Sequence, residues 1–174
     1  MLIELTKGVM INGNTSVTSA DIEASNGVIH VINKVLLPPG VVDLAIGNSN
    51  FSTLVSAVVK AGLVDALSET GPFTVFAPTN AAFEMLFSDL GVSGINDIPA
   101  EALTPILLYH VVKTNVRSDQ VSTGSVPTLN AANIEVNVNS MGVMLNGSSK
   151  VVAVDVQGTN GVIHAIDKVI LPPQ

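Results

Sequence analysis

Three histidines and their acidic neighbours are the residues of this chain whose types could do chemistry. His164 precedes Asp167 by three positions, and such a pair can relay a proton or bind a metal. On a strand, however, residues three apart point to opposite faces. The chain has no Cys and no two His four residues apart, which are the usual zinc-ligand patterns. We therefore expect no metal site, and we expect His30, His110 and His164 each to bond a nearby backbone or carboxylate group and fix a turn or strand register.

Other catalytic patterns are also missing from the sequence. No Gly-x-Ser-x-Gly occurs, and the segment 91–94 is one residue too short for it. No glycine-rich loop has the spacing that cradles phosphate. Asp65 and Glu69 are four residues apart on an expected helix, where a solvated face explains them. We expect no catalytic residue, no cofactor and no enzymatic activity.

Length, composition and charge exclude several partners. The 174 residues carry a net charge of −7 and contain 3% aromatic residues. A nucleic-acid binder needs a basic surface, and an anionic membrane repels an acidic protein. No apolar run approaches the roughly 20 residues that span a bilayer, so we expect no membrane insertion of this segment. The N-terminus lacks the pattern of a signal peptide, and we expect any export signal to lie outside this sequence.

An internal repeat organises the chain. Residues 8–39 align without gaps with residues 142–173, and 18 of the 32 positions are identical. His164, for example, follows His30 by 134 positions, which is the size of a whole domain. We therefore predict a complete repeat over 40–174, preceded by the C-terminal part of another repeat over 1–39.

Within the complete repeat, helix signals come first and strand signals follow. Apolar spacing and caps predict helices over 41–47, from Ser49 or Asn50 to 61, near 64–67, from Thr79 to 90, and over 101–109. A strand is expected at 73–76 and an extended stretch at 111–112. Period-2 patterns then predict strands at 134–138, 143–145, 151–156 and 162–166, with Asn146-Gly147 as a hairpin turn. This order predicts an α+β domain with a mainly antiparallel sheet.

Three motifs carry a resemblance to a known family. The sequence TVFAPTNAAF at 74–83 resembles the first signature motif of fasciclin-like domains, and LLYHVV at 107–112 resembles their central tyrosine–histidine motif. Residues 160–173 resemble the second signature motif. The resemblance covers 40–174 end to end, and residues 1–39 match a second, partial copy.

The resemblance implies a two-sheet β-wedge with several helices packed along one side. It also implies an extracellular or cell-surface setting, in tandem arrays, with roles in adhesion or matrix association. Two family sites for partner contact map onto this chain. Tyr109 and His110 form the central motif, and an Asp-Ile pair described as integrin-binding matches Asp155-Val156 and, in the partial copy, Asp21-Ile22. The residues that flank Asp155-Val156 depart from the binding pattern.

The expected function is a non-catalytic adhesion or matrix-interaction module with protein or matrix partners. The alternative is a binding module for an apolar ligand, a carotenoid or a lipid, in a cavity between the helices and the wedge. Residues 1–39 supply strands but no helices and need a partner. They can lie along their own neighbouring domain, or they can replace an equivalent 135–173 segment in another molecule and so form a homo-oligomer by domain swapping.

Overall fold

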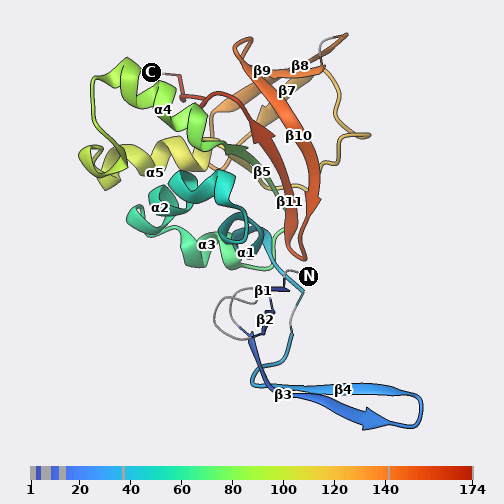
Figure 1. The fold of residues 1–174 in the computed structure, drawn as a ribbon. Helices are drawn as coiled ribbons and strands as arrows, with labels where there is room; N and C mark the ends of the chain where they lie inside the picture. The colour runs from blue at the N-terminus through green and yellow to red at the C-terminus, as the bar shows by residue number, and fades with distance from the viewer. Residues whose placement is uncertain (1–2, 5–8, 12–14, 37, 141, 174) are drawn as a thin grey trace. The chain divides into compact units, whose positions relative to one another are not determined.

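The computed structural model of the chain describes residues 3–4, 9–11, 15–36, 38–140 and 142–173. The chain divides into two compact units (Figure 1), residues 1–38 (unit 1) and residues 39–174 (unit 2). The elements of unit 1 are β1 Ile3–Glu4, β2 Met10–Ile11, β3 Thr15–Ala24 and β4 Gly27–Ile32. Those of unit 2 are α1 Val41–Ile46, η1 Ser49–Phe51, α2 Ser52–Lys60, α3 Val64–Ser68, β5 Phe73–Pro78, α4 Asn80–Leu90, η2 Ile95–Asp97, α5 Ala100–Tyr109, β6 Val111–Val112, β7 Gly124–Pro127, β8 Asn133–Asn139, β9 Gly142–Leu145, β10 Ser149–Gln157 and β11 Gly161–Ile166.

The helices of unit 2 begin and end at residues with recognisable capping chemistry. Thr79 caps α4 by accepting a backbone N–H from the first turn, as the sequence predicts, and Gly91 ends that helix in the left-handed conformation, with φ 67°. The cap before α2 lies earlier than expected. Asn48, and not Ser49 or Asn50, accepts the backbone N–H there and starts the 3₁₀ turn η1, which runs directly into α2.

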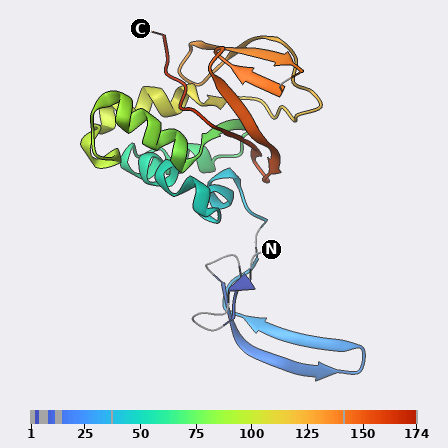
Figure 2. The same cartoon turned by 45° about the horizontal axis from the view of Figure 1, so that its top comes forward.

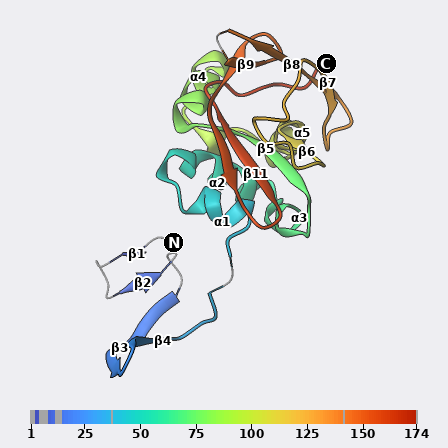
Figure 3. The ribbon, with the colours of Figure 1, turned by 90° about the vertical axis from the view of Figure 1, so that its right-hand side faces the viewer.

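The sheet of unit 2 has seven strands in the order β6-β5-β11-β10-β9-β8-β7. All neighbours are antiparallel except β5 and β11, which run in parallel side by side (Figure 3). Strand β10 belongs to both halves of the sheet, because Ser149 and Lys150 pair with β9 whereas Val151 to Gln157 pair with β11. The sheet therefore bends at β10 into a wedge, and the helices lie along one side of it (Figure 1), which confirms the predicted α+β fold.

Turn chemistry sets the register of this sheet. Asn146 and Gly147 have φ angles of 48° and 67°, and together with Ser148, whose backbone N–H donates to the backbone oxygen of Leu145, they form a three-residue turn. They connect β9 to β10 where the sequence predicts a turn. Strand β7 was not foreseen from the sequence, because its four residues include Gly124 and Pro127 and lack a clear apolar alternation.

Two apolar cores flank the plane of β5 and β11. The first lies between the helices and the helix-facing side of these strands, and it includes Phe51, Leu54, Phe83, Leu103, Leu107, Val75 and Ile163. The second fills the wedge and includes Phe76, Tyr109, Ile134, Val136, Leu145, Ile166 and Ile170. Strand β11 is thus buried on both faces, as its near-continuous apolar sequence indicates.

Unit 1 is a four-stranded antiparallel sheet in the order β1-β2-β3-β4, and its long hairpin β3–β4 is visible in Figure 2. The hairpin repeats the pairing of β10–β11 at an offset of 134 residues. Ile22 pairs with Ile29 as Val156 pairs with Ile163, and both ladders carry register shifts at matching positions. Asp21 and Asp155, at the second shift, have φ angles of 57° and 59°. That unit 1 ends a preceding fasciclin-like domain stays a prediction.

Candidate functional site

Tyr109, the last residue of α5, is buried inside unit 2, and its hydroxyl group has hydrogen-bond partners there. Its side chain is 2% exposed and packs within the wedge core. Its hydroxyl group donates to the backbone oxygen of Asn133 at 2.7 Å and accepts from the side-chain amide of Asn146 at 2.9 Å. Asn133 begins β8 and Asn146 lies in the β9–β10 turn, so the phenol joins the helical layer to the outer strands of the wedge.

His110 follows directly and faces the other core. It is 1% exposed, and its Nε2 accepts the backbone N–H of Ile170 at 3.1 Å. The proton of the neutral ring is therefore on Nδ1, which donates to the backbone oxygen of Ile106 at 2.7 Å. Burial lowers the pKa of His110 to about 4, against the raising effect of the Ile106 bond. The imidazole is neutral near pH 7 and connects the end of α5 to the C-terminal segment.

Through these contacts, Tyr109 and His110 support the fold of unit 2. Every polar atom of the two side chains has a partner inside unit 2, and neither ring reaches the surface. A partner could touch them only after local opening of the domain. Direct contact through this motif stays a prediction.

Asp155 and His164 form a second polar cluster, between β10, β11 and the segment 114–118. The Asp155 carboxylate accepts from both the backbone N–H and the hydroxyl group of Ser118, and these two bonds hold the pKa of Asp155 below its usual value. His164 is buried, accepts the backbone N–H of Asp155 through Nδ1, and donates through Nε2 to the backbone oxygen of Val116. Val156 is half-buried against the helix-side core. The cluster therefore binds the 114–118 segment to the sheet.

The corresponding residues of unit 1 are exposed. The backbone N–H of Asp21 reaches His30 Nδ1 at 3.2 Å, which reproduces the bond between Asp155 and His164. Ile22 is 42% exposed, and both Asp21 and His30 lie at the surface of the unit. Of the six residues predicted for partner contact, only Asp21 and Ile22 are classed as exposed.

These bonds confirm the prediction that each histidine bonds a nearby backbone group. Asp167 accepts the backbone N–H of Lys150 at 2.7 Å, while both ring nitrogens of His164 are engaged elsewhere. His164 and Asp167 therefore do not act as a relay. Among the residues that the structure describes, no three His, Cys, Asp or Glu side chains converge as metal ligands. No helix of that part of the chain is long and apolar enough to cross a membrane.

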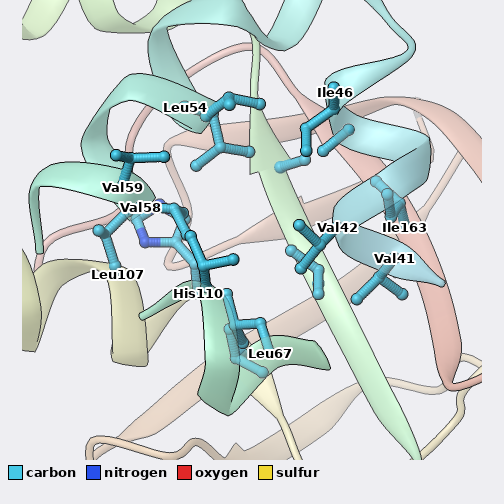
Figure 4. A pocket seen from close by; sticks show the side chains of 16 residues that line it. Val41, Val42, Ile46, Leu54, Val58, Val59, Leu67, Leu107, His110 and Ile163 are labelled. Atoms are coloured by element: carbon cyan, nitrogen blue, oxygen red, sulfur yellow. The ribbon is translucent and has the colours of Figure 1, made fainter. Parts of the chain in front are cut away.

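An apolar groove lies between helices α1, α2 and α3 and strands β5 and β11 (Figure 4), in the region where the alternative function expects a cavity, although the sequence analysis did not name its residues. Val42 and Ile46 of α1 face Leu54 and Val58 of α2 across it, and the ring of His110 lies among the side chains that line it. Its enclosed volume is about 50 Å³. Ile46 and Val59 are 62% and 61% exposed, so the groove opens to the surface. The sequence signal for this groove is the number of valines in α1 and α2, which is larger than the number that one face of each helix can bury.

Asn160 is a further residue whose role the sequence reasoning missed. Its side-chain oxygen accepts the N–H of Val41 at 2.9 Å, and its amide donates to the backbone oxygens of Leu67 and Glu69 at 2.9 and 2.8 Å. One side chain thus joins the turn before β11 to the start of α1 and the end of α3. The second signature motif therefore begins with a side chain whose hydrogen bonds hold these three segments together.

Comparison with known proteins decides the family. The profile of the Fasciclin domain matches residues 2–38 and 49–172. This chain belongs to the fasciclin family. It is 46% identical over 133 residues to protein sll1483 of Synechocystis sp., and the aligned region covers 76% of this chain and 73% of that protein. It is 35% identical over 153 residues to human periostin, which covers 86% of this chain but 18% of periostin.

A solved structure confirms the fold of this fasciclin chain. A FAS1 domain pair from the insect cell adhesion molecule Fasciclin I matches with a TM-score of 0.65 and 22% identity, over 90% of this chain and 60% of the solved one. At this identity the likeness shows the fold alone. The fasciclin chain spans only part of periostin and of the domain pair, so the activities of whole relatives enter below as proposals.

Proposed function

We propose that this fasciclin chain is a non-catalytic adhesion or matrix-interaction module that acts outside the cell or at its surface. The observation that carries the proposal is membership of the fasciclin family, whose fold it shares with a domain pair from a cell adhesion molecule. The polar residues of the family motifs support it. Tyr109, His110, Asp155 and His164 all bond within unit 2, which leaves surface contact as the mode of action.

Asp21 and Ile22 are the accessible residues for such a contact. A carboxylate beside an exposed aliphatic side chain offers one charged and one apolar group to a partner. The equivalent Asp155 has its carboxylate bonded to Ser118, and the equivalent Val156 is half-buried, so that pair presents less free surface.

The test is adhesion of cells or matrix-coated beads to immobilised chain 1–174. We expect adhesion to the wild-type chain. The double variant Asp21→Ala, Ile22→Ala should need a coating density roughly 5- to 30-fold higher for half-maximal adhesion, because a contact pair contributes on the order of 1–2 kcal/mol. Glu23→Ala, an exposed neighbour, is the matched control. Absence of adhesion by the wild-type chain to every surface would contradict the proposal, and equal adhesion of both variants would remove Asp21 and Ile22 from it.

We further propose that residues 1–39 are the C-terminal strands of a preceding fasciclin-like domain in a tandem array. The identical register of β3–β4 and β10–β11 supports this. A homo-oligomer through residues 1–39 stays a prediction. Light scattering on a sizing column, over a concentration series, compares 1–174 with 40–174. Growth of mass with concentration for 1–174 alone would support assembly through unit 1, and equal monomeric behaviour would contradict it.

The groove of unit 2 favours a second candidate, a module that binds an apolar ligand. An enclosed volume of about 50 Å³ is well below the ~150 Å³ that admits benzene, so a carotenoid or lipid chain would have to part α1 from α2. Native mass spectrometry after incubation with a fatty acid tests this. Retained ligand that is lost in Ile46→Asp would support the candidate. An unliganded spectrum at saturating fatty acid would contradict it.

A further inference from the structure

A second cavity of unit 2 lies at the end of α3, beside the start of β5 and the residue that follows β6. Its volume is about 240 Å³, which exceeds the ~150 Å³ that admits benzene. Part of its wall is apolar, because it includes Phe73, which is 4% exposed, and the half-buried Leu129. The rest is polar and includes the side chains of Glu69, Thr70 and Lys113. None of the residues that line this cavity lines the groove beside α1 and α2.

The three polar side chains of this cavity have no partner among the residues that the structure describes. In particular, the Glu69 carboxylate and the Lys113 ammonium line the same cavity without forming an ion pair with each other. A bound molecule that carries both charges can therefore contact both groups.

Hydrogen bonds from Asn160 fix the wall that α3 contributes. The Asn160 amide donates to the backbone oxygens of Leu67 and Glu69 at 2.9 and 2.8 Å. The turn that follows packs tightly against the same residue, since a Cβ on Gly71 would lie 2.1 Å from the backbone oxygen of Asn160. The backbone that carries Glu69 and Thr70 is therefore held in place without a ligand.

The opposite wall is held in the same way. The Thr74 hydroxyl group donates at 2.6 Å to the backbone oxygen of Thr114, which directly follows Lys113. The backbone N–H of Leu129 donates to the backbone oxygen of Val111, in β6, at 2.8 Å. Because both walls are formed in advance, a ligand has little backbone to order when it binds.

The charge pattern decides which class of molecule fits this cavity. A simple anion would face the Glu69 carboxylate, and a simple cation would face the Lys113 ammonium. A neutral apolar molecule would remove both charges from water without a compensating bond, which costs free energy. A zwitterion with an apolar body satisfies both charges and the apolar part of the wall at once.

We propose that this cavity binds a small zwitterion with an apolar body, of the size and chemistry of a free aliphatic amino acid. The carboxylate of the ligand binds the Lys113 ammonium, and its ammonium group binds the Glu69 carboxylate. Its side chain lies against Phe73 and Leu129, and the Thr70 hydroxyl group is available to either charged end.

The test is an NMR titration of the isotope-labelled chain 1–174 with L-leucine. We expect saturable shifts of the amide signals of Glu69, Gly71 and Lys113, with a dissociation constant on the order of 1 mM. Three analogues each lack one feature. Leucinamide lacks the carboxylate, 4-methylpentanoate lacks the ammonium group, and glycine lacks the apolar body. Each should bind at least about tenfold more weakly, because a charged hydrogen bond or the burial of apolar surface is lost.

Two charge variants assign the contacts. Glu69→Gln should bind leucine at least about tenfold more weakly but should not weaken the binding of 4-methylpentanoate, which has no ammonium group. Lys113→Gln should weaken leucine binding to the same extent and should not weaken the binding of leucinamide. Asp65→Asn on α3 and Lys150→Gln on β10, exposed changes outside the cavity, are the matched controls and should bind leucine like the wild type.

Four results would overturn the proposal. The first is the absence of a saturable shift at leucine concentrations far above the expected dissociation constant. The second is a set of shifts confined to residues outside the cavity. The third is equal affinity for leucine and for an analogue with one charge, which would identify a simple ion site. The fourth is wild-type affinity in both charge variants. Adhesion is not measured in this experiment, so the proposed function is tested separately.

Discussion

Replacement of His110 by Gln gives a sharp test of the polar tie between α5 and the C-terminal segment. His110 is neutral and buried, and its pKa falls from 6.5 to about 4 because the charged ring would lose its solvation. Protonation of Nε2 would also place a second donor against the N–H of Ile170. The His110→Gln side chain can keep an acceptor for Ile170 and cannot titrate in this range.

The size and sign of the effect follow from the two pKa values. As pH falls below 6.5 the unfolded chain binds a proton at His110 and the folded chain does not. Stability is therefore full above pH 6.5, declines by about 1.4 kcal/mol per pH unit, and levels off below about pH 4. The total loss is about 3 kcal/mol. The variant should instead be less stable by roughly 1–3 kcal/mol at pH 7, because the Ile106 oxygen loses its donor.

Urea unfolding followed by far-UV circular dichroism, at intervals from pH 7.5 to 4.5, measures both chains. All other titratable groups are common to them, so the difference between the curves isolates His110. We expect the stability of the wild type relative to the variant to fall by about 2.5 kcal/mol between pH 7.5 and pH 4.5, since this range covers most of the interval between the two pKa values. His30→Gln, an exposed change, should alter the unfolding free energy at pH 7.5 by less than about 0.5 kcal/mol. Parallel curves for the wild type and His110→Gln, to within about 0.5 kcal/mol, would refute the role assigned to the buried ring.

Two further predictions use matched positions or bonds. Asn160→Ala should lower the unfolding free energy, measured by urea titration, by roughly 2–4 kcal/mol, because three backbone groups lose their hydrogen-bond partner. The exposed repeat equivalent Asn26→Ala should change it by less than about 0.5 kcal/mol. Equal effects of the two variants would mean that the bonds of Asn160 do not stabilise unit 2. Ser118→Ala should raise the pKa of Asp155 in an NMR titration of its carboxyl carbon, because the Ser118 hydroxyl is the largest cause of its lowered value, and an unchanged pKa would contradict that cause.

Local patterns in the sequence predicted most of the secondary structure. The cap at Thr79 and the turn at Asn146-Gly147 depend on a few adjacent residues, and the structure confirms both. The cap before α2 was misplaced, because three polar residues in a row, from Asn48 to Asn50, can each serve and only the helix geometry selects one. The parallel pairing of β5 with β11 could not be read from periodicity, since it joins segments more than 80 residues apart.

The candidate site was less accessible to sequence reasoning than the fold. The pattern of residues around Tyr109 and His110 identifies the motif but does not say whether the rings face solvent. Their burial depends on what β8 and the C-terminal segment, both distant in the chain, bring to them. The groove beside α1 and α2 depends on helix packing in the same way, and its exposed Ile46 and Val59 are indistinguishable in sequence from core residues.

The two hairpins separate what a segment encodes by itself from what its surroundings supply. With 18 identities in 32 aligned positions, β3–β4 and β10–β11 share their register shifts, their left-handed aspartates and the bond from aspartate N–H to histidine ring. They do so although β4 is exposed and β11 is buried. Pairing and bulges are therefore properties of the hairpin sequence, since they persist without a covering layer. Burial is supplied by the layers that pack on a strand, as the helix-side core and the wedge core do on β11.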